Sequence, residues 1–153
     1  MHEEGRANRM SWQALEDGNK ELAEYGSKRF ASNHVGYLAT IRKDGSPRVH
    51  PMTPFVGEGH LLFFTNDGSL FCRDLRRDGR YALHCSVEDQ DGGQGEFFVR
   101  GQAALTDDPD LWAIAEKYVP YSDREDDYVL FEFSVESAFG RIYGGMLQRW
   151  KQD

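Results

Sequence analysis

The chain has 153 residues, a length typical of one domain with one hydrophobic core. Its net charge of −8 argues against a general nucleic-acid-binding protein, because such proteins present a basic surface. No apolar run approaches the roughly 20 residues that cross a bilayer, and the N-terminus lacks the apolar core of a signal peptide. We therefore expect a single domain over 1–153 that acts in the cytoplasm without nucleic acid or membrane as a partner. Cys72 and Cys85 have no CxxC spacing and are expected to be reduced thiols.

The N-terminal segment is polar up to about Met10, and the sequence predicts a mobile tail over 1–10. A helix is predicted from Ser11 or Asp17 to about Ala31. Large side chains recur there at helical spacing, at Leu22, Tyr25, Arg29 and Phe30. Two glycines, Gly18 and Gly26, weaken this helix.

Residues 35–80 contain three strand-like runs, joined by two glycine turns and followed by a short helix. The first strand is predicted over 35–41 and ends near an Asp-Gly pair, which is a strong hairpin signal. The second is predicted from Pro47 to about Val56 and places Arg48 and His50 on one face. The third is predicted over 60–65. Ser69 is then positioned to cap a helix that reaches about residue 77.

The rest of the chain predicts strands over 81–87, 96–105, 128–135 and 139–143, separated by polar and glycine-rich segments. A helix is predicted from Pro109, with Asp108 as its cap, to about Tyr118. Six or seven antiparallel strands with about three helices indicate a mostly β, α+β domain whose sheet closes into a small barrel. We expect the N-terminal helix to pack its aromatic face across one opening of this barrel.

The central stretch also gathers groups that favour an anion. We expect the second and third strands to be antiparallel neighbours, which puts Arg48 and His50 near the end of the third strand, where the helix after Ser69 begins. Helix N-termini carry unpaired N–H groups and partial positive charge. A guanidinium, a hydroxyl and a capped helix start therefore predict a phosphate seat. From the residues alone, the alternative for Arg48 is an exposed or salt-bridged strand arginine.

The run GYLATIRKDGSPRVHPMTP, followed by LLFFTNDGS and DLRRDGRYALH, resembles the pyridoxamine 5'-phosphate oxidase-like group of flavin-binding proteins over about residues 30–105. The resemblance rests on the order and spacing of several weak motifs. It implies a split β-barrel that forms a homodimer, with two sites for flavin mononucleotide (FMN) at the subunit interface. It therefore implies an FMN-dependent oxidoreductase that transfers hydride to or from an unidentified small-molecule substrate.

The resemblance also implies which residues contact the cofactor. The family's phosphate-binding basic residue corresponds to Arg48, and the backbone along the flavin ring corresponds to the residues after it. An aromatic-threonine pair on the next strand, a serine at the helix start and a polar residue on the long strand complete the set. The implied contacts are Arg48, Val49, His50, Pro51, Phe64, Thr65, Ser69 and Glu96, with Thr53 as a weaker candidate.

Two positions leave alternatives open. The family places basic residues after the helix serine, whereas this chain has Leu70 and Phe71, so a phosphate loses a cation there. Arg73, about one turn further on, either compensates for this loss or is a solvated helix arginine. Trp150 either stacks on the cofactor ring across the dimer interface or anchors the C-terminal tail in an apolar groove.

The five histidines form no HxxxH or HExxH spacing, so no metal site is predicted. No catalytic residue is assigned, because a flavin would carry the chemistry itself. Two alternatives to an oxidoreductase remain. One is a non-catalytic protein that binds or sequesters a flavin, a deazaflavin such as F420, or haem. The other is a family member whose cofactor pocket has decayed.

Overall fold

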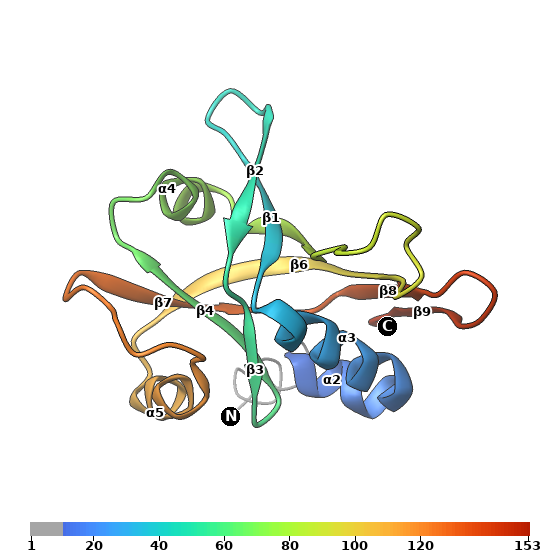
Figure 1. The fold of residues 1–153 in the computed structure, drawn as a ribbon. Helices are drawn as coiled ribbons and strands as arrows, with labels where there is room; N and C mark the ends of the chain where they lie inside the picture. The colour runs from blue at the N-terminus through green and yellow to red at the C-terminus, as the bar shows by residue number, and fades with distance from the viewer. Residues whose placement is uncertain (1–10) are drawn as a thin grey trace.

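The computed structural model describes residues 11–153, and the mobile tail predicted over 1–10 lies outside the described residues. Figure 1 shows a strongly twisted sheet with helices around it. The elements are α2 (Trp12–Gly18), α3 (Lys20–Asn33), β1 (Gly36–Ile41), β2 (Pro47–Met52), β3 (Phe55–Gly57), β4 (His60–Asn66), α4 (Leu70–Arg77), β5 (Arg80–Cys85), β6 (Glu96–Thr106), α5 (Pro109–Tyr118), β7 (Tyr128–Phe133), β8 (Ser137–Arg141) and β9 (Leu147–Lys151). The mostly β, barrel-like class is confirmed, and residues 11–153 contain more strands than the predicted six or seven and one more helix than the predicted three.

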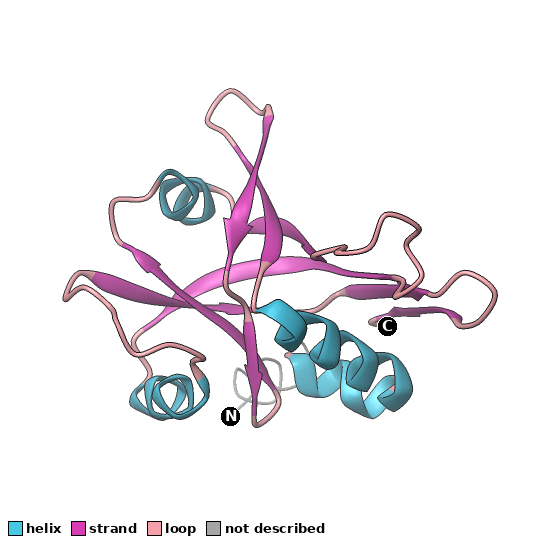
Figure 2. Cartoon of the chain, viewed as in Figure 1, coloured by secondary structure: helices cyan, strands magenta, loops and turns pink. Residues whose placement is uncertain are grey.

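The long strand β6 divides the sheet into its two halves. One edge of β6 pairs with β5, while its other edge pairs first with β8 and then with β7. The result is one run of strands β2-β1-β5-β6-β8-β9 and a second run β6-β7-β4-β3 (Figure 2). At the division, Gly101 lies so close to the crossing chain that an added Cβ would be 2.2 Å from the carbonyl oxygen of Ser134. Glycine is therefore required where the two halves separate.

The core lies between the inner faces of these strands and the helices α2 and α3. Phe97 is completely buried, and its ring contacts the rings of Trp12, Tyr25 and Phe30. The predicted N-terminal helix is present but divides at Gly18. Asn19 ends α2 and starts α3, because its side chain accepts the N–H of Leu22 at 3.1 Å.

The predicted hairpin between the first two strands is confirmed, but the second strand is wrong in its extent, and the part that carries Arg48 and His50 is not a neighbour of the third strand. The second strand ends at Met52, and a separate strand β3 begins at Phe55 after Pro54. β2 pairs with β1, whereas β3 pairs with β4. Proline has no N–H for a sheet ladder, which explains a break at this point. Arg48 and His50 therefore lie on a strand that does not pair with β4.

The C-terminal end of the sheet also differs from the prediction. The last predicted strand, 139–143, is observed as β8 over 137–141, and a further strand β9 follows a turn at Gly144, whose φ is +80°. The sequence of β9 is mostly polar and carries no clear strand pattern, so its extended conformation depends on pairing with β8. Within residues 11–153, no helix combines the length and apolar character needed to cross a membrane.

Candidate functional site

The place where the sequence predicts an anion seat is the junction at which β4 ends and α4 begins. Ser69 caps α4, because its hydroxyl oxygen accepts the backbone N–H of Cys72 at 3.2 Å. The hydroxyl of Thr65 lies 3.1 Å from that of Ser69, so these two groups form a hydrogen-bonded pair at the helix start. We call the region formed by Arg48, His50, Thr65, Ser69 and Phe71 the α4 corner.

Arg48 reaches the α4 corner by packing against the helix itself. Its Nε–H donates to a carboxylate oxygen of Asp74 at 2.7 Å, and the Asp74 side chain is only 4% exposed. The hydroxyl of Thr40 donates to the same oxygen at 2.8 Å. Arg77 donates to the other oxygen at 3.1 Å. Burial alone would raise the pKa of Asp74, but the hydrogen bonds from Arg48, Thr40 and Arg77 outweigh it and hold the pKa below its usual range.

Sequence reasoning missed Asp74 and Thr40, although one signal was present. Thr40 is a polar residue in an otherwise apolar strand, and it lies directly opposite Arg48 in the β1–β2 register. A buried hydroxyl beside a strand arginine indicates that a shared acceptor lies nearby. The salt-bridged alternative for Arg48 is thus what the structure displays.

The two apolar residues after Ser69 point in different directions. Leu70 is 54% exposed, so its side chain does not fill the α4 corner. Phe71 points inward, with its ring edge-on to His50 at a centroid distance of 3.8 Å and stacked on Phe63 at 6.0 Å. The Nε2 atom of His50 is buried and has no hydrogen-bond partner. Burial first, and then the charge of Arg48, lowers the pKa of His50, so its imidazole is neutral at pH 7.

Several predicted residues lie outside the α4 corner. Phe64 is on the opposite face of β4 from Thr65 and packs against Phe55 and Trp112. Glu96 opens β6 and is paired with Arg141 of β8. The other predicted contacts, Val49, Pro51 and Arg73, are exposed to solvent.

Trp150 lies at the opposite edge of the sheet from Arg48. Four strands separate β2 from β9, which corresponds to roughly 24 Å at the usual spacing between strands. The indole of Trp150 packs against α2, where an added Cβ on Gly18 would be 2.1 Å from its Nε1 atom. The structure thus matches the alternative in which Trp150 anchors the C-terminal strand, and a single chain does not bring it to the α4 corner.

The outward side of the strands β2-β1-β5-β6-β8-β9, which we call the outer face, carries a row of rings. His84 stacks on Phe98, which stacks on Phe139 at a centroid distance of 5.2 Å. The guanidinium of Arg149 lies over the Phe139 ring at 5.5 Å. The row continues across β1 and β2 with the half-buried Ala39 and with exposed apolar side chains, at Tyr37, Pro47, Val49 and Pro51.

A pocket of about 490 Å³ opens on the outer face beside this row. Its walls combine aromatic rings with cationic side chains, from Phe98, Phe139, Arg100, Arg149 and Lys151. Such a surface can accept a flat ring that carries negative charge at its edge. Trp150, which the sequence predicted as a candidate cofactor contact, also lines this pocket. Sequence reasoning missed the other lining residues because they come from three strands, one of which was not predicted.

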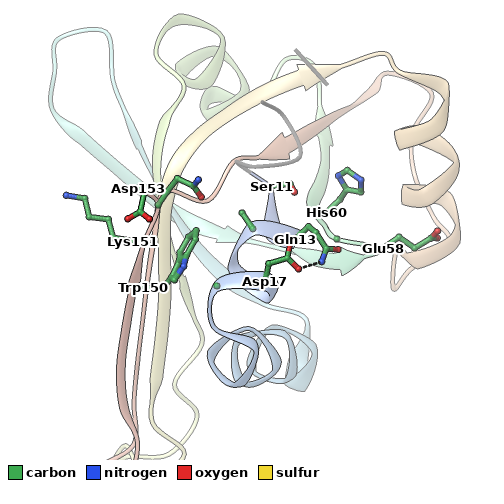
Figure 3. A pocket seen from close by; sticks show the side chains of 12 residues that line it. Ser11, Gln13, Asp17, Glu58, His60, Trp150, Lys151 and Asp153 are labelled. Carbon is green, nitrogen blue, oxygen red and sulfur yellow. Dashed lines mark hydrogen bonds between the residues drawn. The ribbon is translucent and has the colours of Figure 1, made fainter. Parts of the chain in front are cut away.

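A second pocket, of about 630 Å³, lies between α2, the turn before β4 and the C-terminal strand (Figure 3). Asp17, Glu58, His60 and Trp150 line it, and the ring nitrogen Nδ1 of His60 is hydrogen-bonded to Glu132. The hydrogen bond with Glu132 raises the pKa of His60 above its ordinary value. No spacing in the sequence indicated this pair, because its members lie on neighbouring strands.

Replacing Glu132 by Gln is expected to lower the pKa of His60 towards its ordinary value, because the charged acceptor is lost. The native pair contributes stability below pH ~6.5, the unfolded pKa of histidine, and loses it as the pH rises through the folded pKa. NMR titration of the His60 ring measures the change, and the ring of His84 in the same sample is the control. An unchanged His60 titration would mean that the pair does not form in solution.

The sequence model for the family described as "Pyridoxamine 5'-phosphate oxidase" matches residues 26–141. The chain belongs to this family. The match confirms the resemblance and, with the observed strand order, the split-barrel fold. No curated protein gives a significant match. Within residues 11–153, no group of three or more potential metal ligands is present.

Solved structures share the fold at low sequence identity. A haem-binding protein from Mycobacterium smegmatis is 21% identical with a TM-score of 0.68, over 86% of this chain and 58% of that one. A Clostridium acetobutylicum protein of the pyridoxinephosphate oxidase family, related to general stress protein 26, is 15% identical with a TM-score of 0.64. The alignment covers 86% of this chain and 94% of that protein. An F420 reductase is 22% identical with a TM-score of 0.53, and the alignment covers 68% of this chain and 87% of that protein. This chain therefore spans less than two thirds of the mycobacterial protein's length.

Proposed function

We propose that the protein is a flavin-dependent oxidoreductase that binds its flavin between two copies of the chain. Membership of the pyridoxamine 5'-phosphate oxidase family supports this proposal. The observation that carries it is that two complementary surfaces lie far apart in one chain. The α4 corner lies towards one edge of the sheet, and the aromatic end of the outer face lies towards the other. A second copy related by a two-fold axis would place one beside the other.

The residues of the chain would bind and orient the ring rather than react. When bound, a flavin supplies hydride transfer, so the protein needs no strong acid or base of its own. The paired hydroxyls of Thr65 and Ser69 would hold polar groups of the ligand at the start of α4. The orphaned His50 Nε2 atom is a further hydrogen-bonding group for the ligand, provided that Phe71 moves aside. The buried thiols Cys72 and Cys85 suit a reducing compartment, so we also propose a cytoplasmic location.

The outer face supports the proposed homodimer. Val49 on the edge strand β2 is 67% exposed and Tyr37 on its neighbour β1 is 44% exposed, although both are large apolar residues. We expect Val49→Asp to convert a dimer into a monomer, because a carboxylate at a packed apolar interface is costly to desolvate. Light scattering after size-exclusion chromatography measures the mass. Leu105→Asp is the control, since Leu105 is 40% exposed on the part of β6 that pairs with β7. A wild-type monomer would contradict the proposal.

The cofactor assignment is tested by titrating purified protein with riboflavin and FMN while following flavin fluorescence. We expect saturable binding of one flavin per chain, together with a shift of the flavin absorbance bands. A deazaflavin and haemin are titrated in parallel, because both are alternative ligands for an aromatic site. Protein that ignores both flavins would contradict the flavin proposal, and binding of haemin or a deazaflavin alone would replace it.

A non-catalytic binding protein is the second candidate. The observation in its favour is that the α4 corner is already occupied by side chains of the chain itself, with Arg48 bound to Asp74 and Phe71 lying on His50. The two candidates differ in turnover. A bound flavin that nicotinamide nucleotides reduce, and that an acceptor reoxidises, supports the oxidoreductase. A bound flavin that stays oxidised under the same conditions supports the binding protein.

A further inference from the structure

Within one chain, the α4 corner has little positive charge left for a ligand. The charge of Arg48 is matched by Asp74, whose buried carboxylate also receives hydrogen bonds from Thr40 and Arg77. A phosphate that approached Arg48 would have to compete with this carboxylate and would be repelled by it at short range. The ion pair is therefore directed into the protein.

The first turn of α4 adds no cation. It consists of Leu70, Phe71 and Cys72, and the basic residues of the helix follow it, at Arg73, Arg76 and Arg77. The hydroxyl of Ser69 already accepts a hydrogen bond from Cys72 and is paired with Thr65. Phosphate binding at helix N-termini normally combines free N–H donors with a nearby cation. Here the helix start offers hydroxyl groups and an aromatic ring.

The surface that replaces a phosphate seat is aromatic and neutral. Phe71 covers His50 edge-on at 3.8 Å and continues into the stacked ring of Phe63. Beneath Phe71 lies the buried Nε2 atom of His50, which lacks a partner in the structure. A ring ligand could take the place of the Phe71 ring, and a hydroxyl group on its tail could satisfy this nitrogen.

We propose that the α4 corner selects a flavin-type ring with an uncharged polyhydroxyl tail over the same ring with a terminal phosphate. Phe71 is the residue that determines this selectivity, because the first turn of α4 places its ring, and no cation, beside His50. The proposal rests on the proposed function, since it presupposes that a flavin-type ring binds here. Riboflavin is thus expected to be the preferred probe over FMN.

The test is the ratio of dissociation constants of riboflavin and FMN for the wild-type protein, measured by fluorescence quenching at fixed ionic strength. We expect riboflavin to bind at least as tightly as FMN. FMN binding ten-fold or more tightly than riboflavin would overturn the proposal while leaving the flavin function intact. Protein that binds neither ligand would overturn both. This measurement uses only the wild-type protein, so a folding defect in a variant cannot affect the ratio.

Phe71→Lys is expected to shift this ratio towards FMN by about ten-fold, because it adds a charge-assisted contact to the phosphate. Leu70→Lys is the matched control. It adds the same charge at the neighbouring residue, whose side chain is 54% exposed and points away, so the ratio should change by less than about two-fold. Equal shifts in both variants would contradict a specific role for Phe71.

Arg73 is an exposed cation on the same helix. If the wild-type protein preferred FMN and Arg73→Ala removed this preference, the proposal would likewise be overturned.

Discussion

Asp74→Ala is expected to lower the free energy of unfolding by about 2–3 kcal/mol. The Asp74 carboxylate is 4% exposed and holds β1, β2 and α4 together through Thr40, Arg48 and Arg77. Breaking a buried ion pair typically costs about 3–5 kcal/mol when one charge is left without a partner. The Arg48 side chain is 20% exposed and can regain water, so we expect a smaller loss. Urea unfolding at pH 7 measures it.

Asp67→Ala is the matched control for this variant. Asp67 also pairs with an arginine of α4, Arg76, but the two side chains are 53% and 44% exposed. Exposed pairs contribute about 0–1 kcal/mol, so the loss should be clearly smaller. If the two variants lost equal stability, the buried network would have no special structural role.

The same network predicts a pH dependence. Because the folded pKa of Asp74 is depressed, its contribution is fully present above the unfolded pKa of about 3.9. The contribution is lost as the pH falls through the folded pKa. Wild-type stability should therefore decrease in acid more steeply than that of Asp74→Ala, and the two curves should converge. Parallel curves below pH 4 would contradict the assignment.

Phe97→Ala is expected to lower the free energy of unfolding by about 3–5 kcal/mol. Phe97 is fully buried at the centre of the core, where the rings of Trp12 and Phe30 pack against it. At Gly26, α3 approaches so closely that an added Cβ would be 2.2 Å from the Phe97 ring. Because α3 is held against the sheet through this ring, its removal leaves a cavity that the helix cannot fill. Thermal or urea unfolding measures the loss.

Phe98→Ala provides the comparison, because the next residue of β6 faces the other way. Phe98 is half-buried and belongs to the ring row of the outer face. We expect a loss of about 1 kcal/mol in stability, together with weaker self-association or flavin binding. Equal stability losses for Phe97→Ala and Phe98→Ala would mean that the outer face is not a separate, functional surface.

Much of the fold could be predicted because the relevant signals are local. Ser69 and Asp108 were identified as helix caps, and both accept a backbone N–H at the start of their helices. The strand predicted over 81–87 is present as β5 over Arg80–Cys85, and Tyr81, Leu83 and Cys85 are buried on one of its faces. Such patterns depend on neighbouring residues, so they can be recognised without knowing which strands pair.

The candidate site was harder to predict because its contacts join distant parts of the chain. Arg48 was identified as important, but the sequence left open whether it binds a ligand or a carboxylate. Its partner Asp74 lies 26 residues further along the chain. The sequence also left open whether Trp150 contacts a cofactor across a dimer interface or anchors the C-terminal tail, and within one chain its indole packs on α2 at the far edge of the sheet.

The sequence by itself determined the family, the strand-rich class, the helix starts and the group of residues from which a site would be built. Only the tertiary structure decided that Arg48 is neutralised by Asp74, that Phe71 covers His50 and that an aromatic row lines the outer face. The physical reason is that local patterns fix conformation through nearest neighbours along the chain. Charge compensation and ring packing depend instead on which strands and helices meet in space, and the break at Pro54 changed that arrangement here.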